Sequence, residues 1–260
     1  MLRRDFARKA GRVYVILLLM LGFGGVPFPQ LSAQGPPRGQ GVGANGELTL
    51  VTPEEIEVLL AKGTGSAVLP GLSDEAKETA VSRVSSLIAG LPREAEEGRL
   101  DAEGCYTDRG IYHKPPFILG DNEDRISVQS FVERAEVAVI AEVLGAQPGL
   151  VGNSLGTRIH FRVIRDLKGA GIAPGTEWYY GSRDYHFKVN GVLLCRRMNG
   201  FYHEAEGDVV FLVARFARLP KLVLPYGVFQ VKDALLVPQP YEFLLPSDPI
   251  PISDLETELQ

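Results

Sequence analysis

Between residues 135 and 237 the sequence divides into at least six short segments in which apolar and polar residues alternate. Alternation with a period of two is typical of strands that bury one face. The clearest example is 157–167, TRIHFRVIRDL. Its expected inward side chains are Ile159, Phe161 and Val163, and its expected outward ones are Arg158, His160 and Arg162. No long helix pattern interrupts these segments, so the sequence predicts an antiparallel barrel or sandwich.

Turn signals separate the remaining strand segments. These are predicted at 135–144, 177–180, 185–189, 192–196, 208–216, 228–231 and 235–237. Asn190-Gly191 is the strongest hairpin signal in the chain, because both residue types tolerate the positive φ that a two-residue turn needs. Residues 106–128 and 145–156 have no such pattern and are predicted to be irregular.

Two helices are predicted before the strands. Thr52-Pro53-Glu54-Glu55 has the form of a capping box with proline at the first helical position. Ser73 begins a second helix, which Gly90 and Pro92 are expected to end. This pair is too small to bury a core of its own, so residues 48–104 are predicted to be a helical appendage that leans on another part of the chain.

The N-terminal 33 residues have the three regions of a cleavable bacterial-type signal peptide. Five basic residues precede Val13, and an uncharged, mostly apolar run of about fourteen residues follows, which is short for a bilayer span. Leu31-Ser32-Ala33 offers a small residue at the cleavage point. The working protein is therefore expected to begin near Gln34, with a Gly/Pro-rich flexible tether over 34–47.

Two alternatives remain for this leader. It could stay uncleaved as an anchor. The export route is also open, because Arg3-Arg4-Asp5-Phe6 resembles the core of the twin-arginine motif whereas Ala7-Arg8 departs from it. The general secretory route is the favoured interpretation. Either route places the protein outside the cytoplasm, in the periplasm or secreted.

Charge narrows the range of partners. The whole chain carries a net charge of −5, and the leader holds five positive charges and one negative, so about 227 residues with a net charge of about −9 remain after cleavage. An acidic surface repels phosphate backbones, so nucleic acid is not expected as a partner. Beyond residue 33 no apolar run reaches membrane-spanning length.

Cys105 and Cys195 are the two cysteines of the chain. An even pair in an oxidising compartment predicts one disulfide. The alternative is two separate buried thiols. Neither a thioredoxin-like site nor a thiolate zinc site is indicated, because the sequence has no CxxC.

Three segments carry a likeness to a known family. They are Ala135–Val143 (AEVAVIAEV), Phe161–Gly169 (FRVIRDLKG) and Glu206–Leu212 (EGDVVFL), with Cys195 between the last two. Over residues 130–237 the chain resembles bacterial secreted domains with a TIMP-like (netrin-like) OB fold. The resemblance implies a fold more than a function. Metalloprotease inhibitors of the wider family use an N-terminal cysteine as a zinc ligand, and this chain has a Gly/Pro tether there.

The sequence offers few residues for catalysis or metal binding. The four histidines are His113, His160, His186 and His203, and none belongs to an HxH or HExxH motif. His160 and His186 are the pair most able to meet in space. A cluster of Asp121, Glu123 and Asp124 lacks the residue order of an EF-hand. We therefore expect no catalytic residue, no cofactor and no metal site.

Aromatic residues gather near residue 180. Trp178, Tyr180 and Tyr185, with Arg183, are predicted to form a binding face, since OB folds often present such platforms. The alternative is that these rings cover the core and the mouth of the barrel.

The sequence thus predicts a mainly β protein, α+β overall. An OB-like antiparallel barrel over 105–240 follows the two-helix appendage, and a proline-rich tail with a short helical turn occupies 241–260. The leading functional hypothesis is an exported, non-enzymatic interaction module that binds a protein or envelope component. The rivals are a secreted hydrolase or metal-dependent enzyme built from distant residues, and a purely structural envelope protein.

Overall fold

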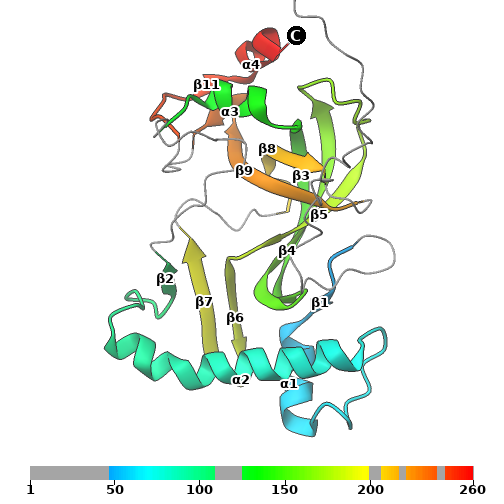
Figure 1. Ribbon diagram of the computed structural model, residues 1–260, viewed down its shortest axis with the longest axis vertical. Helices are drawn as coiled ribbons and strands as arrows, with labels where there is room; N and C mark the ends of the chain where they lie inside the picture. The colour runs from blue at the N-terminus through cyan, green and yellow to red at the C-terminus, as the bar shows by residue number, and fades with distance from the viewer. Residues whose placement is uncertain (1–46, 109–124, 199–205, 217–220, 239–243, 260) are drawn as a thin grey trace, which may run out of the picture. The chain divides into compact units, whose positions relative to one another are not determined.

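The computed structural model describes residues 47–108, 125–198, 206–216, 221–238 and 244–259 (Figure 1). The chain divides into two units, Met1–Gln34 and Gly35–Gln260, and every described residue belongs to the second. The predicted signal peptide and all of the predicted tether except Glu47 lie outside the described residues. None of the helices in the described ranges has the length and apolar character that crossing a membrane requires.

Strands make up most of the regular structure. The helices are α1 (Pro53–Lys62), α2 (Asp74–Glu96), α3 (Val128–Arg134) and α4 (Ile252–Leu259). The strands are β1 (Leu50–Val51), β2 (Tyr106–Asp108), β3 (Val137–Val151), β4 (Ser154–Asp166), β5 (Glu177–Ser182), β6 (Tyr185–Val189), β7 (Val192–Met198), β8 (Val209–Phe216), β9 (Val223–Lys232), β10 (Leu235–Val237) and β11 (Ile250–Pro251).

The strands form two sheets. The larger has the order β11-β10-β9-β8-β3-β4-β5, with β1 paired to the end of β3, and the smaller has the order β2-β7-β6. All neighbouring strands are antiparallel except the pair β2–β7. The predicted mainly antiparallel β class is therefore confirmed. The larger sheet does not close into a continuous barrel, although one parallel bridge joins Tyr179 of β5 to Leu222.

Alternation along the strands gives the larger sheet two apolar faces. Ile159, Phe161 and Val163 of β4 are each at most 2% exposed, which confirms the predicted inward set. They share a core with alternate residues of β3, β8 and β9. The opposite face of β3, β8 and β9 is covered by α3 and α4, whose Phe131 and Leu255 are fully buried.

The helix α3 begins at Val128, the last residue of the stretch predicted to be irregular, and continues to Arg134 over residues for which no element was predicted. Its N-terminus is capped by the Ser127 hydroxyl, which accepts from the backbone N–H of Ser130. Its last carbonyls accept from Lys168 Nζ, which contacts Val132 O at 3.1 Å and also Glu133 O and Ala135 O. A lysine ammonium at a helix C-terminus satisfies carbonyls that the helix itself leaves unpaired. The C-terminal hydrogen bonds of the seven-residue helix α3 therefore come from Lys168, a residue more than thirty positions further along the chain.

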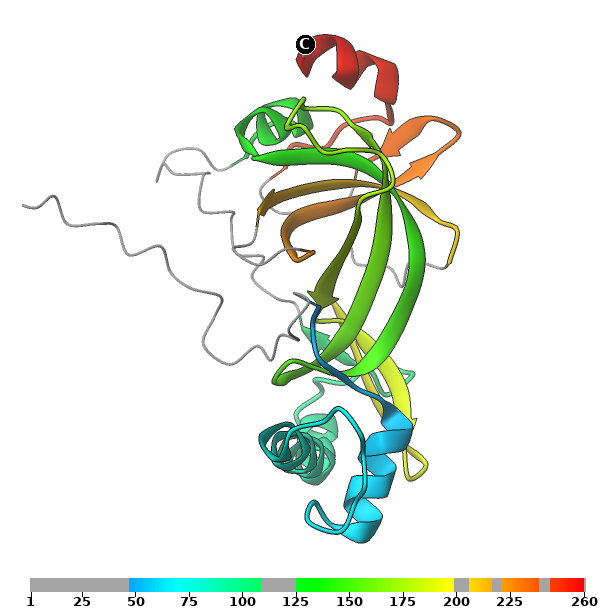
Figure 2. The ribbon, with the colours of Figure 1, turned by 90° about the vertical axis from the view of Figure 1, so that its right-hand side faces the viewer.

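Residues 145–156 form a hairpin end, so the predicted loop was wrong. β3 continues to Val151 and β4 begins at Ser154 after a two-residue turn. Figure 2 shows the two strands as the long green hairpin whose far end lies beside β1. Gly149 and Gly156 stand opposite each other there. A Cβ on either would overlap a carbonyl oxygen, that of Val51 or of Ser182, so these glycines permit close strand approach.

The first helix begins as predicted. The Thr52 hydroxyl accepts from the N–H of Glu55, and the Glu55 carboxylate accepts from the N–H of Thr52 at 2.9 Å. The second helix runs past Gly90 and Pro92 to Glu96, so its predicted end was wrong. Pro92 therefore lies inside the helix, although proline removes a backbone hydrogen bond there. The final turn is held by ion pairs, among them Arg99 Nε to Glu94 Oε2 at 2.5 Å.

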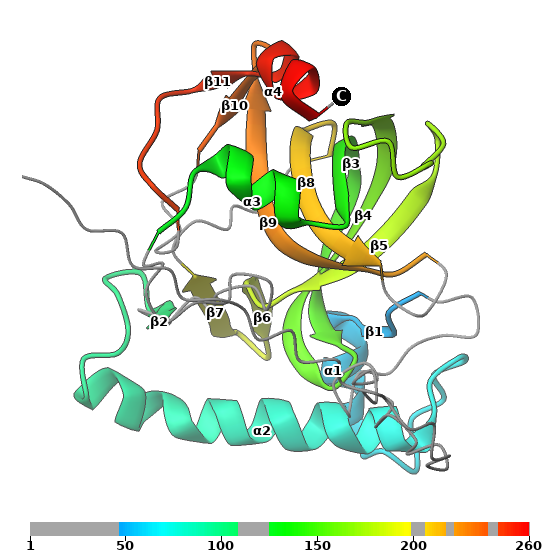
Figure 3. The same cartoon turned by 45° about the horizontal axis from the view of Figure 1, so that its top comes forward.

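Both helices pack on the smaller sheet. Ile56 and Leu59 of α1 and Val84 of α2 share a core with apolar residues of the β6–β7 hairpin. That hairpin turns at Asn190 and Gly191, both with positive φ, as the sequence predicts. Figure 3 shows α2 running past β6 and β7. The helical segment therefore completes its core with residues from the segment predicted to belong to the barrel.

Candidate functional site

The aromatic residues predicted to form a binding face point inward. Trp178, Tyr180 and Tyr185 are 7%, 2% and 5% exposed, and only Arg183 of the predicted set is exposed. The Trp178 ring meets Phe161 edge-on, with centroids 5.9 Å apart. The four residues do not form an exposed platform, because the rings of Trp178, Tyr180 and Tyr185 fill the two cores on the inner side of β5 and β6.

The exposed side of β4 and β5 carries a different group of side chains. We call it the β4–β5 face. It consists of Arg158, His160, Arg162, Glu177 and Tyr179. In the strand register, His160 stands opposite Tyr179 and Arg162 opposite Glu177. The alternation that buries Phe161 and Trp178 places this polar set outward.

His160 and Tyr179 form the centre of the β4–β5 face. Their rings stack with centroids 4.3 Å apart and an interplanar angle of 14°. His160 Nε2 lies 3.0 Å from Glu177 Oε2. Partial burial raises the pKa of the Tyr179 phenol, and Glu47 adds to that rise. The two rings are thus held against each other on a surface that solvent still reaches.

An arginine lies on each side of the ring pair. Arg158 donates to Gln147 Oε1 at 2.6 Å and to Glu47 Oε1 at 2.5 Å, and its guanidinium carbon lies 5.6 Å from the centre of the Tyr179 ring. Arg162 donates to Glu142 Oε2 at 2.7 Å, and this hydrogen bond raises the pKa of Arg162. The cations are therefore fixed by carboxylate and amide partners.

The β4–β5 face combines partial exposure with fixed side chains. Arg158 and His160 have side chains 20% and 27% exposed, and those of Arg162 and Glu177 are 45% exposed. The face offers stacked rings and paired charges of both signs. Such a surface can make aromatic and hydrogen-bonded contacts without a large net charge.

Tyr179 is the residue that sequence reasoning left out of the predicted face. Its strand neighbour two positions earlier is Glu177, a charged residue. Residues of the same parity point the same way, so Glu177 marked the outward side and Trp178 and Tyr180 belonged inside. The signal was present, but a strand of six residues gives few polar positions from which to assign parity.

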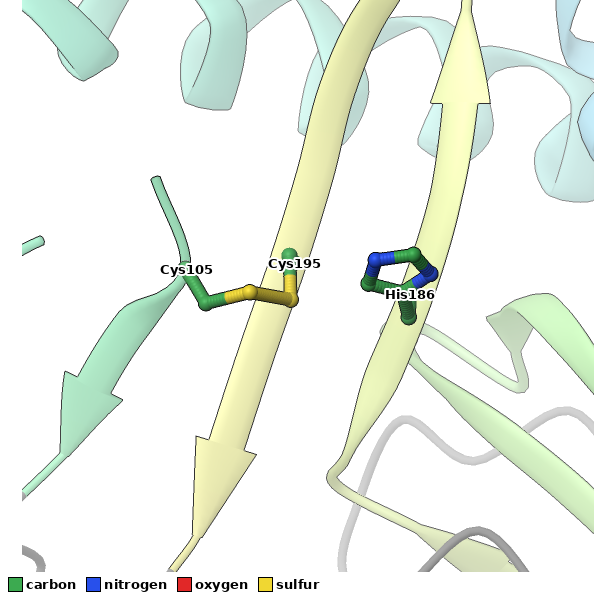
Figure 4. Close-up of side chains that lie close together, drawn as sticks. All are labelled: Cys105, His186 and Cys195. Atoms are coloured by element: carbon green, nitrogen blue, oxygen red, sulfur yellow. A yellow bond between two sulfur atoms is a disulfide. The ribbon is translucent and has the colours of Figure 1, made fainter. Parts of the chain in front are cut away.

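The two cysteines form the predicted disulfide. Cys105 and Cys195 are joined at 2.06 Å, and Figure 4 shows the bond linking β7 to the residue just before β2. His186 of β6 lies beside it, and the histidine and cysteine ligand atoms are all within 4.8 Å of one another. Zinc is bound by thiolates. The bonded sulfur atoms of the disulfide are not thiolates, so this arrangement is structural.

His160 and His186, the two histidines most able to meet in space according to the sequence, lie on different sheets and have different neighbours. His160 contacts Glu177 and Tyr179 on the larger sheet, whereas His186 lies next to the disulfide on the smaller one. His113 and His203 lie outside the described residues, and so does the predicted acidic cluster at 121–124.

No protein-family model, curated protein or solved structure matches this chain. The function is therefore argued from the geometry of the chain itself.

Proposed function

We propose that this protein is an exported, non-catalytic interaction module that binds a protein of the cell envelope through the β4–β5 face. The observation that carries the proposal is the stacked pair of His160 and Tyr179, placed between two anchored arginines. This group stands on paired strands and not on a loop.

Two physical arguments favour a protein partner. Tyrosine and arginine are enriched among residues that dominate protein–protein binding energy. Side chains already held by neighbours also lose less conformational freedom on binding. The mixture of arginines with Glu142 and Glu177 gives a balanced charge, which fits a polar protein surface better than a polyanion.

The strand order supports an OB-like, TIMP-like barrel as the scaffold. The strands β5-β4-β3-β8-β9 are antiparallel neighbours, and the bridge from Tyr179 to Leu222 is parallel. A five-stranded Greek-key barrel of the OB type has this order, with a parallel contact between its first and last members. OB folds bind ligands on the face of their second and third strands. In this chain those strands are β4 and β5.

Export is the third part of the proposal. A structural disulfide and the lack of a membrane-spanning helix in the described part of the chain are compatible with an extracytoplasmic protein. The predicted signal peptide at 1–33 remains the reason for proposing export itself. Mass spectrometry of the protein from the cell envelope should give an N-terminus near Gln34.

A secreted hydrolase, the rival function, is a weaker hypothesis than the interaction module. His160 does have a carboxylate neighbour, Glu177, as an acid–base pair would require. His160 is partly exposed and Glu177 is exposed on a sheet surface, where solvent weakens the electrostatic effects on which catalysis depends.

The test uses the purified protein as bait for envelope extract. Tyr179→Ala and Arg158→Ala should each lose the captured partner. Arg165→Ala is the matched control, because Arg165 is a half-exposed arginine of the same strand that pairs with Glu256 away from the β4–β5 face. Equal capture by wild type and all three variants would refute the proposal. If Arg165→Ala also loses the partner, the loss is a general effect of charge, and that result would refute the proposal too.

A further inference from the structure

The smaller sheet brings two cysteines and a histidine into one row across its three strands. Cys195 of β7 stands directly opposite His186 of β6 in the antiparallel register. On the other side of β7, Cys105 precedes the first residue of β2 and is bonded to Cys195. The sulfur atoms and a ring nitrogen of His186 all lie within 4.8 Å of one another, and Figure 4 shows the imidazole beside Cys195.

The chemistry of this row depends on the state of the sulfur atoms. While the disulfide is intact they are not thiolates, and the bond is structural. Reduction gives two thiols beside an imidazole, and two cysteines with one histidine are a known set of three protein ligands for zinc, with water in the fourth position. The cysteines are 90 residues apart, so the fold brings this set together without a CxxC motif.

Backbone contacts hold the three residues in place independently of the disulfide. The backbone N–H of Cys105 donates to Asp101 Oδ1 at 2.9 Å, and the carbonyl of Cys105 accepts from the N–H of Asp101. The β6–β7 hairpin is paired along its whole length. It is also tied to α1, since the N–H of Asn190 donates to Glu57 Oε1 at 2.6 Å. These hydrogen bonds keep the ligand residues adjacent when the S–S bond is broken.

The surroundings also suit a metal site. Cys105 is fully buried and Cys195 is 5% exposed, whereas His186 is exposed. The sulfur atoms are therefore shielded from water, and an ion can enter from the histidine side. Imidazole has two ring nitrogens, so His186 can bind an ion through one and keep a hydrogen bond through the other, as ligating histidines do.

We propose that reduction of the Cys105–Cys195 disulfide converts this row into a zinc site made of both thiolates and His186. A dithiol donor supplies two electrons and two protons. The S–S bond of the protein breaks into two thiols, and the donor becomes a disulfide. Zinc then displaces the two thiol protons to solvent. Reoxidation removes the thiolate ligands and releases the ion, so the redox state controls metal binding.

The test compares reduced and oxidised protein with Co²⁺ as a spectroscopic probe for zinc. The purified protein is reduced with a phosphine in the absence of oxygen, freed of reductant and titrated. Reduced wild type should bind one equivalent and give thiolate-to-cobalt charge-transfer absorption, which Zn²⁺ should then abolish by displacing the cobalt. The oxidised protein should give no such absorption. Cys105→Ala/Cys195→Ala should give none in either state.

A variant of the histidine tests the third ligand. In the reduced state, His186→Gln should bind Zn²⁺ at least about tenfold more weakly than wild type, since even residues outside the ligand set contribute that much. Lys188→Gln is the matched control, because Lys188 is an exposed residue of the same strand and the same parity. It should bind as wild type does. Zinc should raise the urea midpoint of reduced wild type and of reduced Lys188→Gln more than that of reduced His186→Gln.

Four results would overturn the proposal. They are a reduced wild type without charge-transfer absorption, equal zinc affinity in wild type and His186→Gln, equal weakening by Lys188→Gln, and a loss of the fold on reduction that zinc does not reverse. Circular dichroism of the reduced protein with and without zinc measures the last. Partner capture by the β4–β5 face uses the oxidised protein, so its outcome is independent of these results.

Discussion

His160 on β4 and Tyr179 on β5 stand directly opposite each other, and their rings stack 4.3 Å apart and nearly parallel. A cross-strand pair of this kind is the unit that stabilises a sheet surface. The contact makes the β4–β5 face a rigid surface, because each ring limits the rotation of the other. The stack therefore contributes to stability as well as to the proposed binding surface.

A double-mutant cycle measures this contact. His160→Ala, Tyr179→Ala and the double variant should give a coupling of about 0.5–1 kcal/mol in urea unfolding, since the rings contact each other. His160→Ala combined with Lys232→Ala, at an exposed position on β9, which does not pair with β4, is the control and should be additive. Additivity for the stacked pair would contradict a stabilising contact.

Removal of the disulfide should destabilise the protein. Cys105 and Cys195 are 90 residues apart, so the bond restricts a long loop in the unfolded chain. The double variant Cys105→Ala/Cys195→Ala is expected to lose about 2–5 kcal/mol in the free energy of unfolding. A reducing agent should lower the urea midpoint of wild type and leave that of the double variant unchanged. Mass spectrometry of the native protein should find one internal bridge and no alkylatable thiol.

The glycine pair at the end of the β3–β4 hairpin should not tolerate a methyl group. In Gly149→Ala and Gly156→Ala the new Cβ would overlap a carbonyl oxygen, so each should cost about 1–3 kcal/mol. Gly145→Ala on β3 is the control, because a Cβ there meets no atom within 4 Å. A similar loss in all three variants would show that the carbonyl contacts are not the cause.

Tyr185 should make stability depend on pH in alkaline solution. Burial raises the pKa of its phenol above the ordinary value of 10.0, and Arg196 partly opposes the rise. Above pH 10 the unfolded chain releases this proton first, so folding stability is lost as pH rises through the folded pKa. In Tyr185→Phe the urea midpoint should therefore fall less between pH 9 and pH 11 than in wild type. An equal fall in both proteins would argue against a buried phenol at this position.

Local signals predicted a large part of the fold. The alternation of residues 157–167 gave the buried face of β4 correctly, because a strand with one solvated face must place polar side chains on it. The Asn190-Gly191 turn and the Thr52–Glu55 capping box were also correct. Each depends on residues close together in the chain, whose backbone preferences and hydrogen bonds need no distant partner.

The errors arose where distant contacts decide the structure. Gly149 and Gly156 looked like loop residues, yet β1 and the end of β5 approach so closely that only glycine fits. The helix α3 is short, and the carbonyls at its C-terminus accept hydrogen bonds from Lys168, a residue that follows the whole β3–β4 hairpin in the sequence. Neither contact can be predicted from the residues that are close by in the sequence.

The sequence by itself determined the mainly antiparallel class, the cysteine pair and the outward side of β4. The parity of Glu177 was a weak local signal for the outward side of β5, and the tertiary structure decided which aromatic residue joined that side, because a six-residue strand takes its orientation from the strand beside it. Pairing with β4 turned Trp178 and Tyr180 into the core and left Tyr179 stacked on His160. Tertiary packing also placed α2 against the β6–β7 hairpin.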